Sequence, residues 1–254
     1  MQIQLLRHAT LVVRAGSITL LVDPMLSPAG AMAPVANAAD ERRFPLVDLP
    51  LSREAVGDLV AAVDAVLLTH THRDHWDDEA RRLIPALTPL FCPPGDIEAV
   101  RGAGFRMALA VADALVWRGV RFTRAAGRHG TAEVGRQMGA VSGYVIDAPG
   151  EPRLYIAGDT VWCDKLQFAL AKWRPEVVVV NAGGAQFVTG GPITMSAEDV
   201  VRTREAAPAG AVVVAVHFEA VNHCRLTRAA LRAHLEAAGG GRVLVPEDGE
   251  TLTF

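Results

Sequence analysis

The residues with the clearest chemical potential lie in one short stretch, LLTHTHRDHWDD, in which His70, His72, Asp74 and His75 directly follow the apolar run DAVLL. Side chains of an extended segment alternate, so the first three of these four share a face, and a bend is needed to add His75. Imidazole and carboxylate ligands without thiolate suit zinc, manganese, iron or nickel, and a water would complete a catalytic site. The stretch therefore predicts a catalytic metal centre rather than a histidine-rich surface loop.

The elements that must position this motif begin with three predicted strands, QIQLL, TLVVR and ITLLVDP, which form an antiparallel meander closed by Pro24. From Met25 to about Ser52 the composition shifts to alanine, proline, asparagine and charge, without a clear period. Loops of this length in compact domains are usually functional or disordered. We therefore predict a mobile lid over about residues 25–52.

In the middle of the chain, helical spacing predicts a helix at 53–63, and the apolar run DAVLLT predicts a buried strand. A further helix is expected after His75, with three acidic residues in its first turn. Glycine and proline then separate short strands, which indicate a second, mainly antiparallel sheet. These strands are expected at 90–92, 114–117, 120–124, 141–147 and 154–157.

The last third alternates between helices and the strands VVVVN, AVVVAVH and RVLVP. The helices are expected at 163–172, 196–206 with Ser196 as N-cap, and 227–238 before three glycines. Strands followed by β/α alternation, twice over, predict an α/β protein in which two sheets are sandwiched between helices. With no evident linker, we expect a single domain over residues 1–254.

The H-x-H-x-D-H motif resembles the signature of the metallo-β-lactamase superfamily, whose fold is an αββα sandwich of two mixed β-sheets flanked by helices. Further positions match the pattern of that family in order along the chain. The matching residues are Asp23 in LLVDP, His129 after RFTRAAGR, Asp159 in LYIAGDT and His217 in VVVAVHF.

The resemblance implies a cofactor of two divalent metal ions, with zinc expected and manganese or iron as alternatives. One ion would be held by His70, His72 and His129, the other by Asp74, His75 and His217, with Asp159 between them. Two cations roughly 3.5 to 4 Å apart share a water and lower its pKa towards neutrality. Asp74 and Asp159 would therefore take part in catalysis as well as in metal binding.

Within the superfamily, the segments LLRHAT, GDTVW and VPEDGETL look most like the branch that contains L-ascorbate-6-phosphate lactonase. Class B β-lactamases differ, because they carry cysteine where Asp159 stands, and Cys163 lies four residues away. Glyoxalase II has an extra helical domain for which this chain has no residues to spare.

Four polar residues outside the motif are candidates for substrate contact or catalysis. His223 follows the ligand position His217 closely enough to orient a substrate oxygen or supply a proton, which makes it a catalytic candidate. Glu219 and Asn222 share its short loop and are candidate substrate contacts. His8 lies between two strands and is either a hydrogen-bonded core histidine or a residue near the metals or substrate.

These features together predict a metal-dependent hydrolase in which a metal-bound hydroxide cleaves an ester-like, lactone or phosphoester bond of a small molecule. A phosphodiesterase or phospholipase-like hydrolase would use the same site with a different lid and groove. A non-catalytic metal-dependent binding or sensing protein is the alternative from another class.

The composition limits the partners that are expected. Lys and Arg total 25 against 28 Asp and Glu, so a net charge of −3 offers no basic excess for nucleic acid. No apolar run approaches the roughly 18 residues of a membrane span, and the start lacks the features of a signal peptide. We expect a cytoplasmic protein with reduced cysteines and a small-molecule substrate, and a homo-oligomer is left open.

Overall fold

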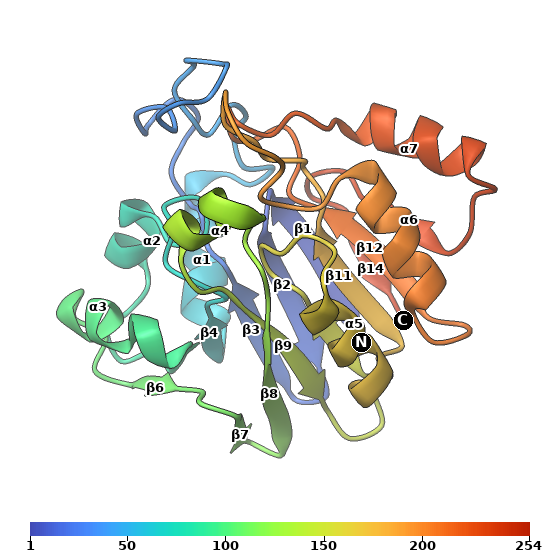
Figure 1. The fold of residues 1–254 in the computed structure, drawn as a ribbon. Coiled ribbons are helices and arrows are strands. Elements are labelled where there is room, and N and C mark those ends of the chain that lie inside the picture. Colours follow the sequence, from blue (N-terminus) through green and yellow to red (C-terminus); the bar gives the residue numbers. More distant parts are fainter.

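Two seven-stranded sheets pack face to face in the computed structural model, which describes residues 1–254 except for the side chain of Ala132 (Figure 1). The first sheet has the order β14-β1-β2-β3-β4-β5-β6. Its strands are β1 (Gln2–Arg7), β2 (Thr10–Ala15), β3 (Ile18–Val22), β4 (Ala65–Leu67), β5 (Leu90–Cys92), β6 (Ala108–Ala110) and β14 (Thr251–Thr253).

The second sheet has the order β13-β12-β11-β10-β9-β8-β7. Both sheets are mixed, because each combines an antiparallel meander with parallel strands linked by helices. The strands are β7 (Ala114–Trp117), β8 (Val120–Ala126), β9 (Ser142–Asp147), β10 (Leu154–Ile156), β11 (Val177–Asn181), β12 (Val212–Val216) and β13 (Val243–Leu244).

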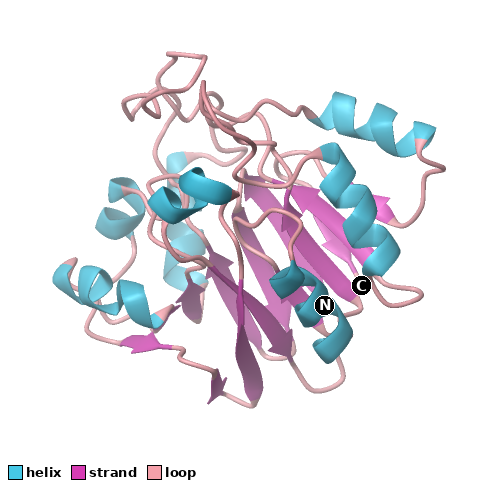
Figure 2. Cartoon of the chain, in the orientation of Figure 1, coloured by secondary structure: helices cyan, strands magenta, loops and turns pink.

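Helices cover the outer face of each sheet (Figure 2). Helices α1 and α2 pack on the first sheet, and α5, α6 and α7 pack on the second. The helices are α1 (Arg53–Ala62), α2 (Asp78–Leu83), α3 (Ile97–Gly102), α4 (Ala132–Met138), α5 (Asp164–Trp173), α6 (Ala197–Ala206) and α7 (Arg228–Ala237), with a 3₁₀ turn at Pro94–Asp96. The expected αββα sandwich is confirmed.

The strand periodicity explains these layers. In β11, Val177 and Val179 face the core between the sheets, while Val178 and Val180 face the helices. Strands that are apolar on both faces are typical of sheets covered on both sides. Because successive side chains point to opposite faces, one valine-rich strand contributes to two cores.

The sequence-based prediction needs correction at five short elements. Strand β5 lies in the first sheet, parallel to β4 and β6, rather than in the second antiparallel run. Helices α3 and α4 and strands β6 and β14 were not expected, and each is at most seven residues long. Short elements carry too few residues for a clear period.

Residues 25–52 connect β3 to α1 as a long loop at the end of the sandwich where the predicted metal ligands lie (Figure 1). The loop contains one isolated bridge between Met32 and Phe44. Buried Arg7 donates to the carbonyls of Met25 at 2.7 Å and Val47 at 2.8 Å, which ties both ends of the loop to β1. Among the described residues, no helix is long and apolar enough to cross a membrane.

Candidate metal centre

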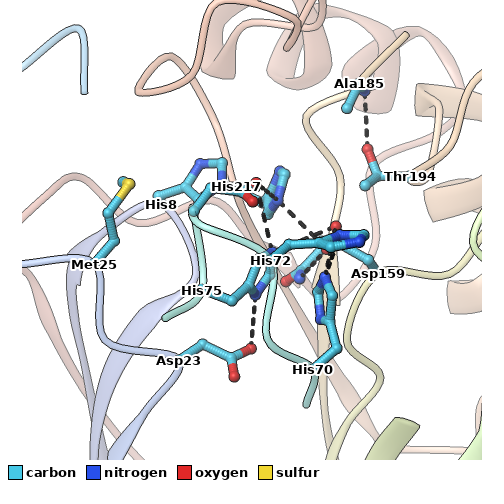
Figure 3. Close-up of polar contacts among 12 residues, drawn as sticks. His8, Asp23, Met25, His70, His72, His75, Asp159, Ala185, Thr194 and His217 are labelled. Carbon is cyan, nitrogen blue, oxygen red and sulfur yellow. Dashed lines mark hydrogen bonds and ion pairs between the residues drawn. The ribbon is translucent and has the colours of Figure 1, made fainter. Parts of the chain in front are cut away.

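The predicted metal ligands follow the ends of four strands at one end of the sandwich. His70 to His75 follow β4, His129 follows β8, Asp159 follows β10 and His217 follows β12. Strand ends are where an α/β sheet gathers functional side chains, because loops there can turn inward without disturbing the core. The labelled side chains of His70, His72, His75, Asp159 and His217 converge although these residues lie far apart in the sequence (Figure 3).

The first group of ligand atoms comes from His70, His72 and His129, whose ring nitrogens lie within 4.8 Å of one another. The Nε2 atom of His70 is 3.0 Å from Nδ1 of His72. The expectation that alternate residues of the motif share a face therefore holds for this pair. We call these three residues the first set.

The second group contains Asp74, His75, His217 and His8, whose ligand atoms lie within 4.8 Å of one another. We call the three predicted ligands among them, Asp74, His75 and His217, the second set. Oδ2 of Asp74 lies 3.7 Å from Nε2 of His75 and 3.7 Å from Nε2 of His217. Asp74 does not share a face with His70 and His72, because the extended segment ends at His72. A turn begins there, and the His72 carbonyl accepts both the His75 and the Trp76 amide.

Asp159 lies between the two sets. Its Oδ2 is 3.4 Å from Nε2 of His129 and 3.3 Å from Nε2 of His75, and its Oδ1 is 3.3 Å from Nε2 of His217. The carboxylate is 2 % exposed. It is held by Asn181 at the end of β11, whose Nδ2 donates to Oδ1 at 2.7 Å. One carboxylate therefore reaches ligand atoms of both sets.

Several ligand histidines are oriented by a hydrogen bond to the ring nitrogen that faces away from the cluster. Asp23 accepts from Nδ1 of His75 at 2.9 Å, and it also accepts from the Thr69 hydroxyl at 2.6 Å. That hydroxyl lies 3.0 Å from Nδ1 of His70. Asp23 thus supports one histidine of each set, as partners of metal-ligating imidazoles usually do.

His129 follows the same pattern, since its Nδ1 donates to the carbonyl of Ile193 at 2.8 Å. Fixing this proton on Nδ1 leaves Nε2 free to accept a cation. In the part of the chain that the structure describes, the buried Nε2 atoms of His75, His129 and His217 have no hydrogen-bond partner. Buried polar atoms are rarely left unpaired, so these nitrogens fit divalent metal ions.

The electrostatics of the cluster agree with this fit. Burial lowers the pKa of His70 and His217 well below the usual value, which keeps both imidazoles neutral. Burial acts in the opposite sense on Asp159, but His75 outweighs it and holds the pKa of this carboxyl well below its usual range. Burial lowers the pKa of His75, but the nearby Asp159, Asp74 and Asp23 carboxylates outweigh it and raise that pKa well above its usual value. Neutral imidazoles and an ionised carboxylate are the forms that bind metal ions.

A pocket of about 290 Å³ opens above the cluster. Its lining combines ligand residues with apolar side chains from the lid and from the loops around it. The lining residues are Val35, Phe44, Thr71, His72, Arg73, Asp74, His129, Met138, Asp159, Phe187 and His223.

The four residues that the sequence offers as candidates for substrate contact or catalysis lie in different surroundings in the structure. His223 lines the pocket, is 6 % exposed, and burial lowers its pKa. Glu219 turns away from the pocket, because its carboxylate accepts from the amide of Arg228 at 3.0 Å and from its guanidinium at 2.6 Å. The expectation that Glu219 contacts substrate is therefore corrected: an ion pair at the start of α7 engages it. His8 is fully buried beside Asp74 and does not line the pocket.

Asn222 contacts the lid rather than the pocket. Its Oδ1 accepts from the amide of Val35 at 2.9 Å, and its Nδ2 donates to the carbonyl of Asp40 at 2.5 Å. The sequence placed this residue near the substrate, but the structure gives it the role of fastening the loop that covers the pocket.

Replacing Asn222 by alanine should loosen the lid, which the sequence predicts to be mobile. Loss of two hydrogen bonds worth about 1 kcal/mol each should raise the rate of tryptic cleavage after exposed Arg42 and Arg43 by about 30-fold. Mass spectrometry of timed digests measures the rate, with His234→Ala on distant α7 as control. Equal cleavage of the wild type and the Asn222 variant would contradict this role.

Two residues of the site were missed from the sequence, Asn181 and Thr69. Asn181 ends the apolar run VVVVN, and Thr69 directly precedes the histidine motif. A polar residue at the end of a buried strand was the available signal in both cases.

Comparisons with known proteins agree with this geometry. A family model described as "Beta-lactamase superfamily domain" matches residues 19–218. UPF0173 protein YddR of Bacillus subtilis is 37% identical, with 100% of each chain covered. A UPF0173 metal-dependent hydrolase of Ignicoccus hospitalis is 27% identical over 83% of this chain and 88% of its own length.

One similar solved structure is an isothiocyanate hydrolase from gut bacteria of Delia radicum. It is 38% identical to this chain, covers 100% of this chain and 99% of its own, and superimposes with a TM-score of 0.93. The Bacillus protein and the isothiocyanate hydrolase thus match over essentially the whole chain, and the family model spans residues 70–217, which contain both sets of candidate ligands.

Proposed function

Because this chain belongs to the metallo-β-lactamase superfamily and, within it, to the UPF0173 metal-dependent hydrolases, we propose that it hydrolyses a small molecule at a centre of two divalent metal ions. The position of Asp159 carries the proposal, since its oxygens lie within 3.4 Å of nitrogens from both sets. A shared carboxylate offsets the repulsion between two neighbouring cations. Zinc is expected, with manganese or iron as alternatives.

When bound, the metal ions lower the pKa of a coordinated water towards neutrality and so supply a nucleophile. The chain itself holds the substrate against the cluster. Phe44 and Val35 of the lid cover the pocket, while Phe187 and Met138 complete its apolar walls. Apolar walls beside the ligand residues reduce the water around a bound substrate and strengthen the electrostatic contacts there.

The pocket favours a compact, uncharged electrophile over a phosphoester. Among the described lining residues, Arg73 is the only arginine or lysine, and its guanidinium carbon lies 5.2 Å above the Phe44 ring. It also donates to the carbonyl of Ala33 at 3.4 Å. Phosphate recognition usually relies on cationic side chains aimed at the anion.

Isothiocyanates are the first substrates to test, because a relative with 38% identity over the whole chain is an isothiocyanate hydrolase. Water adds to the central carbon of R–N=C=S to give a thiocarbamic acid, which breaks down to the amine R–NH₂ and carbonyl sulfide. The oxygen of water ends on the carbonyl sulfide, and its two protons end on the amine nitrogen. A short linear functional group of this kind suits a pocket of about 290 Å³.

The proposal is tested by a substrate panel assayed with zinc-, manganese- and iron-loaded protein. The panel contains aryl and alkyl isothiocyanates, lactones, carboxylic esters, phosphomonoesters and phosphodiesters. We expect turnover of a carbon electrophile and much weaker hydrolysis of phosphodiesters. Faster lactone cleavage would support the lactonase-like branch, while phosphodiester cleavage would support the phosphodiesterase-like alternative. Turnover of no substrate would favour a metal-dependent binding or sensing protein.

Replacing His223 by alanine should lower turnover on the best substrate by about 10- to 1000-fold, the usual range for one polarising or proton-transferring group. The imidazole lines the pocket but belongs to neither set, so both metal ions should stay bound. Steady-state kinetics measures the turnover, and elemental analysis of the same sample measures the bound metal. His234→Ala removes a histidine on distant α7 and should change neither quantity. Wild-type kinetics in the His223 variant would exclude it from catalysis.

A further inference from the structure

His8 lies in the turn between β1 and β2 with a strained backbone and a fully buried side chain. Its side chain is 0 % exposed, and its backbone has φ +61°, in the left-handed region that residues other than glycine rarely adopt. Its carbonyl accepts the amide of His217 at 2.8 Å, which ties this turn to the end of β12. The fold therefore presses a histidine side chain against the second set.

His8 contacts two members of that set. Its Nε2 lies 3.2 Å from Oδ2 of Asp74, and its ring centroid lies 3.6 Å from that of His217 with 37° between the planes. We propose that His8 is a positioning residue of the metal centre: it donates a hydrogen bond to Asp74 and packs on His217, so that the second set binds its metal ion tightly. The inference rests on the proposed two-metal function.

The other ligands show why Asp74 needs such a partner. His75 is oriented by Asp23, and His129 by the carbonyl of Ile193. Among the described residues, His8 is the hydrogen-bond donor to the Asp74 side chain. Partners of this kind contribute about 10- to 100-fold to metal affinity, because they fix the orientation of the ligand before the metal binds.

A matched pair of variants isolates the hydrogen bond. Glutamine at position 8 places an amide nitrogen about as far from the backbone as Nε2 of histidine, so His8→Gln keeps a donor for Asp74. His8→Asn carries the same amide one methylene shorter and does not reach it. Asparagine also tolerates the left-handed backbone better than glutamine does. Backbone strain alone would therefore weaken zinc binding more in the glutamine variant, which is the opposite of the expected result.

The experiment measures zinc bound per chain and zinc affinity by competition with a chelator. We expect two zinc ions for the wild type, affinities within about threefold of the wild type for His8→Gln, and about 10- to 100-fold weaker binding of one zinc ion for His8→Asn. His234→Ala controls for the loss of a histidine that lies outside the site. Thermal unfolding of the metal-free proteins checks the fold, and His8→Gly serves as a second donor-free variant.

Several outcomes would overturn the inference. Wild-type affinity at both sites in His8→Asn or His8→Gly would show that Asp74 needs no partner. Equal losses in His8→Gln and His8→Asn would contradict the hydrogen bond to Asp74 as the basis of the effect, and would leave the imidazole ring itself, as a ligand or by its packing on His217, as the cause. Fewer than two zinc ions in the wild type would contradict the proposed two-metal function itself, so that failure is distinguishable from a failure of the role of His8.

Discussion

Replacing Asp159 by asparagine should lower turnover by about 1000-fold or more while the fold stays intact. The substitution barely changes volume, but it removes the negative charge that lies within 3.4 Å of ligand nitrogens of both sets. Metal ions supply several kcal/mol of transition-state stabilisation, and each 1.4 kcal/mol corresponds to a factor of ten in rate. Steady-state kinetics with elemental analysis measures the effect.

Cys163→Ser is the matched control for this variant. Cys163 lies near Asp159 in the sequence, but its sulfur contacts the Thr160 hydroxyl at 3.7 Å and joins neither set. We expect near wild-type turnover for the serine variant. Unchanged turnover and metal content in Asp159→Asn would reduce Asp159 to a turn residue, and a large loss in Cys163→Ser would favour a β-lactamase-like ligand arrangement.

Replacing Asp23 by alanine should weaken metal binding at both sets. Its buried carboxylate accepts from the Thr69 amide at 2.7 Å, from the Thr69 hydroxyl at 2.6 Å and from Nδ1 of His75 at 2.9 Å. Loss of a supporting partner costs about 10- to 100-fold in metal affinity for each ligand, or about 10²- to 10⁴-fold over both sets. Zinc titration by chelator competition measures this, and turnover should fall in parallel.

Asp77→Ala is the matched control, since it also removes a buried, hydrogen-bonded carboxylate. Asp77 caps α2 by accepting from the Ala80 amide at 2.7 Å and holds the Ser27 amide at 2.7 Å. Both variants should unfold at lower temperature, because buried donors lose their acceptor. Only Asp23→Ala should lose zinc affinity. Equal zinc affinity in the two variants would limit Asp23 to a stabilising role.

Much of the architecture could be predicted because its strands and caps leave clear patterns. The meander 2–22 alternates faces, VVVVN is apolar on both faces, and Ser196 forms a capping box with Asp199 at the start of α6. The H-x-H-x-D-H motif specified most of the metal cluster, since four ligand residues follow one buried strand. These features are local, and local spacing is what a single sequence reports most directly.

The remaining features depend on contacts between segments that are distant in the sequence. Asn222 bonds the lid at Val35 across 187 residues, and Glu219 is engaged by Arg228 rather than by the pocket. Strand β14 is three residues long and exists because it pairs with β1 at the other end of the chain. Tertiary pairing of this kind leaves no periodic signal in either partner.

Part of the pocket lining comes from the lid, and the sequence did not reveal this contact either. Phe44 is 1 % exposed, yet it lies in a segment whose composition predicts only a loop. Its ring both lines the pocket and underlies the Arg73 guanidinium. Substitutions at Phe44 and Val35 should therefore alter substrate preference without touching the metal ligands.

The number of metal ions bound per chain tests the central claim most directly. Elemental analysis of protein purified without added metal, followed by zinc titration of the same protein after chelation, should give two tightly bound divalent ions per chain. Asp159→Asn should lower that number or weaken at least one ion. A single ion at saturation would contradict the two-metal centre, and an absence of tight binding would contradict the metal site as a whole.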